Sequence, residues 1–119
     1  MRLIVSIVAM LVLVLALSAG AQSATKLERK QAMKWYWTSG AQCVKSKEGA
    51  WTSNTGNGYY GGFQADKDFQ RAYGKEFYYG IGLAHTWKPW QQIVMAWRGW
   101  KQRGWQPWPN TSLMCGLSY

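Results

Sequence analysis

The chain has 119 residues, a formal net charge of +9, nine Trp residues and five acidic residues. A chain of this length forms one small domain, and its core alone gives only marginal stability. Two cysteines and the single His85 are too few for a structural zinc site, which takes four ligands. Composition therefore excludes a multidomain protein and a zinc-stabilised fold, and we expect no metal and no cofactor.

The N-terminus has the layout of a secretory signal peptide. Its charged start precedes an apolar stretch over 3–17, and a small, polar stretch follows over 18–24. The apolar stretch is shorter than the about 20 residues that a membrane-spanning helix needs. We predict a signal peptide over 1–21, with cleavage at its end or as late as Ala24, and a secreted protein. An uncleaved N-terminal anchor is the alternative.

Export would bring the two cysteines, Cys43 and Cys115, into an oxidising compartment, where disulfides persist. A bond between them would close most of the domain into one loop, which is worth about 4 kcal/mol in the chain-entropy model. We therefore predict a disulfide between Cys43 and Cys115. Two buried free thiols are the alternative.

Charge and aromatic content indicate the kind of partner. The positive charge favours polyanions, and an exported protein meets anionic lipid and bacterial cell wall before nucleic acid. Nine Trp residues suit a sugar-binding groove or a membrane interface, although core packing is the better explanation for any single one. We expect a monomer with no nucleic-acid partner and no stable membrane association after signal cleavage. A cationic, Trp-rich antimicrobial protein is a competing interpretation.

A helix is predicted over 25–42, because apolar residues recur there among charged ones and no Gly or Pro interrupts the pattern before position 40. The pattern can continue as a second short helix over 41–48, with Gly49 available to end it. We accordingly divide the chain after the signal peptide into an N-terminal helical segment over 22–40 and a domain over 41–119.

The middle of the chain changes character over 51–64, where turn-forming residues lie between aromatic ones. This pattern predicts a loop or a small β-hairpin, with an Asn-Gly pair at its turn. Asp66 then suits the cap of a helix over 67–73, which Gly74 can end.

The clearest helical pattern covers 88–103, where apolar residues recur at intervals of three and four. Pro89 suits the first turn of this helix, and Gly104 can cap its end. We expect Arg98 on its polar side. Two prolines in the tail over 105–110 predict an irregular, extended course there.

Glu48 is the strongest catalytic candidate among the five acids. Glu28 has basic neighbours with which a solvated ion pair is expected, and Asp66 has a capping role. Asp68 and Glu76 lie in polar stretches beside lysines. Glu48 instead precedes a glycine at a predicted helix end, near a tryptophan. A carboxyl group against apolar rings stays protonated near neutral pH and can donate a proton, although an ordinary exposed helix acid is the alternative.

Two stretches carry a resemblance to a known family. The segment Cys43–Trp51 is followed over 54–64 by Asn-Thr-Gly-Asn-Gly-Tyr-Tyr-Gly-Gly-Phe-Gln, and the chain closes with Trp-Pro-Asn-Thr over 108–111 and Cys-Gly-Leu over 115–117. Together they resemble the transglycosylase-like domain of the actinobacterial resuscitation-promoting factors and their lysozyme-like relatives. The resemblance spans 41–117.

The resemblance implies a small lysozyme-like α+β domain, mostly helical with a short hairpin and closed by one disulfide. It implies a groove for peptidoglycan glycan strands, in which Glu48 is the catalytic acid and Gln64 hydrogen-bonds sugar. Thr55 and Tyr60 would line this groove. Trp51 is the preferred tryptophan for sugar contact because it is nearest Glu48 in the chain, and core packing is its equal alternative.

One position departs from the family pattern. In the best-known members Glu follows the first Cys directly, whereas this chain has Val44 there. A related branch has Glu five residues after the Cys, which matches Glu48. Five residues exceed one helical turn, so the carboxyl group can reach the same spot only if the helix shifts. A catalytically inactive cell-wall or carbohydrate-binding protein on the same fold is therefore the alternative.

The number of carboxyl groups bears on the mechanism, because hydrolysis by the usual route uses two. With Glu48 alone, the muramic acid 6-hydroxyl can act as nucleophile and close a 1,6-anhydro ring. We expect a secreted, cell-wall-associated lytic transglycosylase or muramidase that cleaves the MurNAc–GlcNAc bond in cell-wall remodelling. Hydrolysis remains open if Asp66 or Asp68 folds over the cleft.

Overall fold

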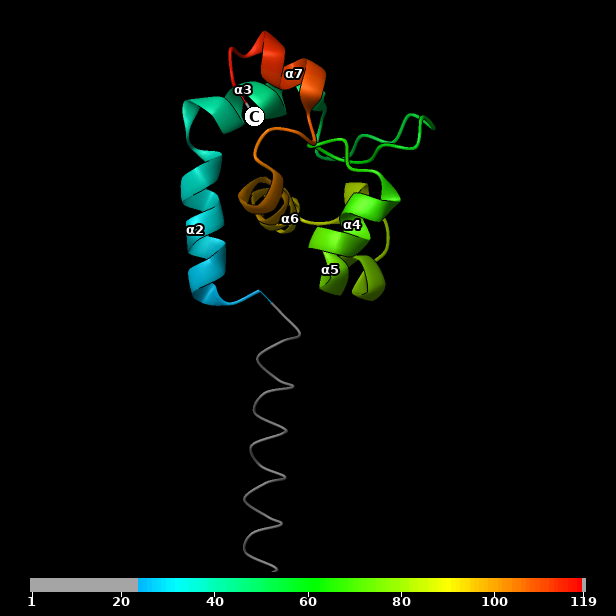
Figure 1. Ribbon diagram of the computed structural model, residues 1–119. Coiled ribbons are helices and arrows are strands. Elements are labelled where there is room, and N and C mark those ends of the chain that lie inside the picture. The colour runs from blue at the N-terminus through cyan, green and yellow to red at the C-terminus, as the bar shows by residue number, and fades with distance from the viewer. Residues whose placement is uncertain (1–23, 119) are drawn as a thin grey trace, which may run out of the picture.

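The computed structural model describes residues 24–118, which form a mainly helical domain (Figure 1). The predicted signal peptide over 1–21 lies outside the described residues. Within those residues, none of the helices has the length and apolar character that a membrane crossing requires. The elements in chain order are α2 (Lys26–Tyr36), α3 (Ser39–Glu48), α4 (Lys67–Tyr73), α5 (Lys75–Gly80), the 3-10 helix η1 (Ala84–Thr86), α6 (Pro89–Arg103) and α7 (Pro109–Met114).

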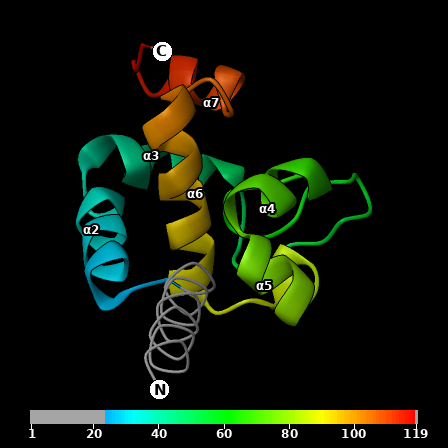
Figure 2. The same ribbon diagram turned by 60° about the horizontal axis from the view of Figure 1, so that its bottom comes forward.

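Helix α6 lies at the centre of the domain, with α2 on one side and α4 and α5 on the other (Figure 2). The predicted helix over 88–103 is thus confirmed, and Pro89 is in its first turn, where a missing N–H costs no hydrogen bond. Seven of its residues are buried: Gln92, Ile93, Val94, Met95, Ala96, Trp97 and Gly99. The core forms around this helix because its apolar positions cover most of its circumference.

The single helix predicted over 25–42 is wrong in its extent, because the chain breaks between α2 and α3. Thr38 has an extended backbone, and its hydroxyl accepts a hydrogen bond from the N–H of Ala41 at 3.4 Å, as an N-cap does. The same hydroxyl donates to the carbonyl of Trp35 at 2.7 Å. The break lets α3 turn across the end of α2 and bury Val44 (Figure 1).

The predicted hairpin is present only as two isolated β-bridges, Asn54 with Tyr60 and Tyr60 with Ala65. Its turn contains Gly56 and Gly58, whose φ values of 82° and 85° lie in the left-handed region that favours glycine. No regular strand occurs between residues 24 and 118. The fold is therefore mainly helical.

Two buried glutamines hold the segment between α3 and α4 in position. Gln92 accepts a hydrogen bond from the N–H of Gly62 at 2.8 Å and donates to the carbonyl of Trp51 at 3.0 Å. Gln70 donates to the carbonyl of Ala65 at 2.9 Å. These side chains supply the hydrogen bonds that a regular sheet would otherwise provide to the buried backbone.

Helix α4 follows the prediction closely. Asp66 caps it by accepting a hydrogen bond from the N–H of Phe69 at 2.7 Å, and Gly74 ends it. The rings of Phe69 and Tyr73 lie 4.7 Å apart on one face, as four-residue spacing requires. The short helix α5, which starts directly after Gly74, has no counterpart among the predicted elements.

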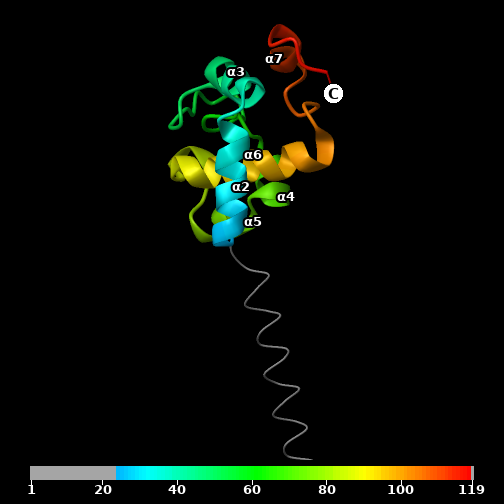
Figure 3. The same cartoon turned by 90° about the vertical axis from the view of Figure 1, so that its left-hand side faces the viewer.

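The predicted irregular tail is correct only up to Trp108. Pro109 begins α7, because a proline at the first helical position needs no N–H partner. The predicted disulfide is confirmed: Cys43 in α3 and Cys115 after α7 are bonded, with their Cα atoms 6.0 Å apart. Both helices lie at the same end of the molecule (Figure 3).

Arg98 and Glu28 do not have the solvated surroundings expected of them. The guanidinium group of Arg98 pairs with Glu28 at 2.7 Å and with Glu76 at 2.5 Å, and all three side chains are at most 26% exposed. The Arg98 hydrogen bond lowers the pKa of Glu28. This ion triad joins α2, α5 and α6, and sequence spacing could not reveal it because its members lie far apart in the chain.

Candidate functional site

Glu48 is the last residue of α3 and is half-buried. Its Oε1 accepts a hydrogen bond from Oγ1 of Thr111 in α7 at 2.5 Å. Burial raises the pKa of Glu48, and the Thr111 hydrogen bond opposes this effect because it favours the charged form. A carboxyl group with a raised pKa remains protonated closer to neutral pH and can serve as a proton donor.

Gly49 allows the chain to leave α3 directly beside Glu48. A Cβ at this position would lie 3.1 Å from Nε2 of Gln64 and 3.3 Å from the carbonyl oxygen of Gly61. A side chain here would therefore crowd the segment that returns past Glu48. The backbone of Gly49 is extended, a conformation open to any residue, so it is these tight contacts that disfavour a larger side chain here.

A pocket of about 340 Å³ adjoins Glu48. It is bounded by the end of α3, the glycine-rich segment before α4 and the beginning of α7. Its lining residues are Glu48, Asn57, Tyr59, Gln64, Pro107, Trp108, Pro109, Asn110 and Thr111. Glu48 is the only acidic residue of the described part of the chain that lines this pocket.

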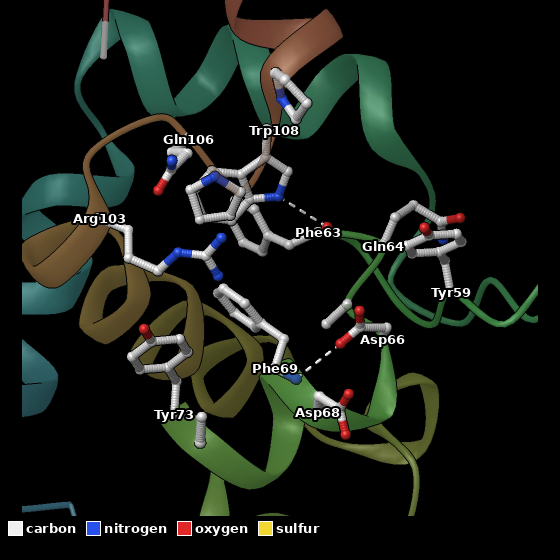
Figure 4. Close-up of a pocket in the computed structure, with 14 residues that line it drawn as sticks. Tyr59, Phe63, Gln64, Asp66, Asp68, Phe69, Tyr73, Arg103, Gln106 and Trp108 are labelled. Carbon is white, nitrogen blue, oxygen red and sulfur yellow. Dashed lines mark hydrogen bonds between the residues drawn. The ribbon is translucent and has the colours of Figure 1, made fainter.

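A second pocket, of about 480 Å³, shares five lining residues with the first, including Tyr59, Gln64 and Trp108 (Figure 4). It extends from these shared residues to α4 and the end of α6. The two pockets therefore adjoin and form one groove.

Gln64 lies at the boundary of the two pockets. Its φ of 49° is in the left-handed region, which is uncommon for a residue other than glycine, and its Nε2 donates to the carbonyl of Gly61 at 2.9 Å. Nearby, Nε1 of the buried Trp108 donates to the carbonyl of Phe63 at 2.9 Å (Figure 4). These hydrogen bonds fix the side chains of Gln64 and Trp108, which line both pockets of the groove.

The other sequence candidates lie outside the Glu48 pocket. Trp51 packs against Phe63, with ring centres 6.0 Å apart, and carries the ammonium group of Lys45 4.5 Å above its ring. Tyr60 stacks on His85 at 5.6 Å and lines a different pocket of about 430 Å³. Thr55 is exposed and lines neither pocket of the groove. Their contact with a ligand stays a prediction.

Sequence reasoning did not assign Thr111 to the site, and it preferred Tyr60 to Tyr59 for substrate contact, although Tyr59 lines both pockets of the groove. In the sequence Thr111 is part of the closing Trp-Pro-Asn-Thr segment, and in the structure its backbone carbonyl accepts a hydrogen bond from the N–H of Cys115, one helical turn away. Because Cys115 is bonded to Cys43 and Glu48 follows Cys43 by five residues, the disulfide itself indicates that Thr111 and Glu48 are near each other. That signal was present in the sequence.

Val44, which departs from the pattern of the resembling family, is fully buried in the core. Position 44 thus faces away from solvent, whereas position 48 lines the groove. The four-residue offset moves the acid along α3 by slightly more than one turn.

No other acid of the described residues shares the Glu48 pocket. Asp66 and Asp68 line the larger pocket instead, where Asp66 caps α4 and Asp68 pairs with Arg71. Glu28 and Glu76 belong to the Arg98 triad. Among the described residues, Glu48 therefore supplies the one carboxyl group that a ligand in the smaller pocket would meet.

The fold and this groove define a class of protein. This chain forms a small lysozyme-like domain that is mainly helical and closed by one disulfide. The chain belongs to the transglycosylase-like domain family, whose model matches residues 21–111.

Two curated proteins are similar to this chain. Resuscitation-promoting factor Rpf1 of Corynebacterium glutamicum is 38% identical over 82 residues, which cover 69% of this chain and 40% of that protein. Resuscitation-promoting factor RpfC of Mycobacterium tuberculosis is 36% identical over 81 residues, which cover 68% of this chain and 53% of that protein. The matched region thus spans about half, or less, of these relatives.

Proposed function

We propose that this protein is a secreted enzyme that cleaves the glycan strands of peptidoglycan, with Glu48 as its single catalytic acid. The observation that carries the proposal is the half-buried carboxyl group of Glu48, which lines a groove and has a pKa raised by burial. Membership of the transglycosylase-like family and similarity to resuscitation-promoting factors support the substrate class. The disulfide supports an oxidising, extracellular location.

Lytic transglycosylation fits a pocket with one carboxyl group. Glu48 donates its proton to the glycosidic oxygen, and the bond from that oxygen to C1 of muramic acid breaks. The 6-hydroxyl oxygen of the same sugar then bonds to C1, and its proton passes to the Glu48 carboxylate. The products are an anhydro sugar end and a free hydroxyl, and Glu48 is again protonated. The chemistry requires no cofactor.

Other residues of the groove would orient the strand. Gln64 lines both pockets, so its side chain is suited to hydrogen-bond a sugar that spans them. Thr111 orients the Glu48 carboxyl group through the 2.5 Å hydrogen bond. Thr55, Tyr60 and Trp51 would contribute only to more distant parts of a bound strand.

Mass spectrometry of the fragments released from purified peptidoglycan tests the proposal. The oxidised wild-type protein should release muropeptides with 1,6-anhydro ends, and the Glu48→Gln variant should release none. Reducing ends would assign hydrolysis instead, with a water molecule as nucleophile. Wall binding without release by either protein would identify a carbohydrate-binding protein and refute cleavage.

A further inference from the structure

The larger pocket of the groove is not needed to hold the bond beside Glu48. It has about 480 Å³, compared with about 340 Å³ for the Glu48 pocket, and it extends away from Glu48 towards α4. Phe69 and Trp108 contribute apolar surface to it, whereas Gln106 and Arg103 contribute polar groups (Figure 4). Its mixed lining suits a substituent that carries both apolar and charged groups.

Arg103 is the only cationic residue among those that line this pocket. It is in the last turn of α6, and Figure 4 shows its guanidinium group directed into the pocket between Phe69 and Trp108. Within residues 24–118 it makes no hydrogen bond or ion pair with another side chain. A guanidinium group offers a planar pair of donors that matches a carboxylate.

Complementing the negative end of α6 is a simpler role for Arg103, because cations are favoured in the last helical turn. Lys101 is in the same turn and meets that need as well, with its ammonium group 3.7 Å from the ring centre of Trp97. Helix complementation therefore does not explain why the Arg103 side chain is directed into the pocket.

Neither of the two acids of the pocket pairs with Arg103. Asp66 is occupied by the N–H of Phe69, and Asp68 is paired with Arg71. Both belong to the α4 wall, whereas Arg103 belongs to the α6 end of the pocket. An anionic group would accordingly be attracted to the α6 end and repelled from the α4 wall, which orients it.

We propose that the larger pocket binds a carboxylate-bearing substituent of the glycan strand, and that Arg103 is the residue that binds the carboxylate. The inference rests on the proposed function, since it takes the ligand to be peptidoglycan. Its muramic acid bears a lactyl group, which ends in a carboxylate or continues through an amide bond into a short peptide with carboxylates of its own. Both sources present the same chemistry to Arg103.

Binding measurements in the inactive Glu48→Gln background test this assignment without turnover. The ligands are a muropeptide tetrasaccharide with its peptides, the same glycan stripped to free lactyl groups, and the peptide-bearing glycan with every carboxylate amidated. Adding Arg103→Gln should weaken binding of a carboxylate-bearing glycan about tenfold, as expected for a partly solvated charge-assisted hydrogen bond. Binding of the amidated glycan should change less than about twofold.

The two acidic ligands distinguish the source of the carboxylate. Weakening only with the stripped glycan assigns the lactyl carboxylate, and weakening only with the peptide-bearing glycan assigns a peptide carboxylate. Weakening with both shows that Arg103 binds a carboxylate from either source. Arg103→Lys should keep part of the affinity. Lys34→Gln on α2 is the matched control, because it removes one exposed positive charge away from the groove and should leave binding unchanged.

Two results would overturn the assignment. In the first, Arg103→Gln binds the acidic glycans as tightly as its parent does. In the second, the substitution weakens binding of the acidic and the amidated glycans equally. Failure of the proposed function is a separate result: the wild-type protein would then release no fragments, while the Arg103-dependent binding of acidic glycans persisted. A thermal melting curve of each variant verifies that it is folded.

Discussion

The hydroxyl Oγ1 of Thr111 lies 2.5 Å from Oε1 of Glu48, and this hydrogen bond joins α7 to the last residue of α3. The disulfide between Cys43 and Cys115 holds the same two segments together. Both connections act on the proposed acid. The geometry of Glu48 therefore depends on the C-terminal helix as well as on its own.

Replacing Thr111 with Val should shift the pH dependence of activity to higher pH. The hydroxyl stabilises the charged form of Glu48, so its loss raises the pKa further. An acid catalyst is active below its pKa, and the limb on which kcat/KM falls with rising pH should therefore move upwards. Measured pH profiles of cleavage check this shift. Thr111→Ser keeps the hydroxyl and should retain the wild-type profile; an unshifted profile for Thr111→Val would contradict the expected role.

The Glu48→Gln variant should be more stable than the wild-type protein at neutral pH. Burial raises the pKa of Glu48 in the folded protein above its value in the unfolded chain. The contribution of Glu48 to stability is therefore fully present below the unfolded pKa and is lost as pH rises through the folded pKa. Glutamine does not titrate and can still accept the Thr111 hydrogen bond. We expect the Tm of the variant to exceed that of the wild type by a few degrees at about pH 8. The gain should vanish at about pH 3.5, and a gain that does not depend on pH would argue against the raised pKa.

Replacing the buried Gln92 with Leu should destabilise the domain by about 2–4 kcal/mol, because it leaves buried backbone groups without partners. These groups are the N–H of Gly62 and the carbonyls of Trp51 and Trp87. Urea unfolding measures the change. Gln102→Leu makes the same substitution at an exposed position of α6 and should stay within about 0.5 kcal/mol of wild type. Equal effects of the two variants would contradict the structural role of Gln92.

Replacing Arg98 with Met should destabilise the protein by about 2–3 kcal/mol at neutral pH, somewhat below the value for a fully buried pair that loses one partner. Glu28 and Glu76 would be left without their cation. Because the Arg98 hydrogen bond lowers the pKa of Glu28, the stabilisation is present above the unfolded pKa and is lost as pH falls through the folded pKa. The difference in unfolding free energy should therefore shrink at acid pH.

The control for this experiment is Arg71→Met, which breaks the exposed pair with Asp68. An exposed pair contributes at most about 1 kcal/mol, so this variant should be nearly as stable as the wild type. A larger loss for Arg71→Met than for Arg98→Met would refute the importance of the buried triad.

Local signals explain which helices could be predicted from the sequence. Pro89 and the apolar spacing after it fix the beginning and face of α6, and Asp66 caps α4 through its own side chain. The break at Thr38 escaped prediction because its capping hydroxyl interrupts a continuous amphipathic pattern. Pro109 suggested an irregular course, although a proline also suits a first helical turn.

The residues of the candidate site also divide into those that the sequence predicts and those that it does not. Glu48 and Gln64 were identified from short motifs in the chain, and both line the groove. Thr111 and Arg103 were not identified, because each meets the groove from a segment distant in sequence. Nearness to Glu48 along the chain favours Trp51 for sugar contact, but in the structure its ring packs on Phe63.

The sequence by itself determined the local features: the strongest helices, their caps, the pairing of its two cysteines and the acid at the end of α3. The helices and their caps depend on interactions between residues close together in the chain. The disulfide follows because two cysteines can pair within the chain in only one way. Tertiary structure decided the burial of Glu48, the partners of Arg98 and the direction of Arg103. Such properties arise only when distant segments pack together, because burial and charge pairing depend on neighbours in space.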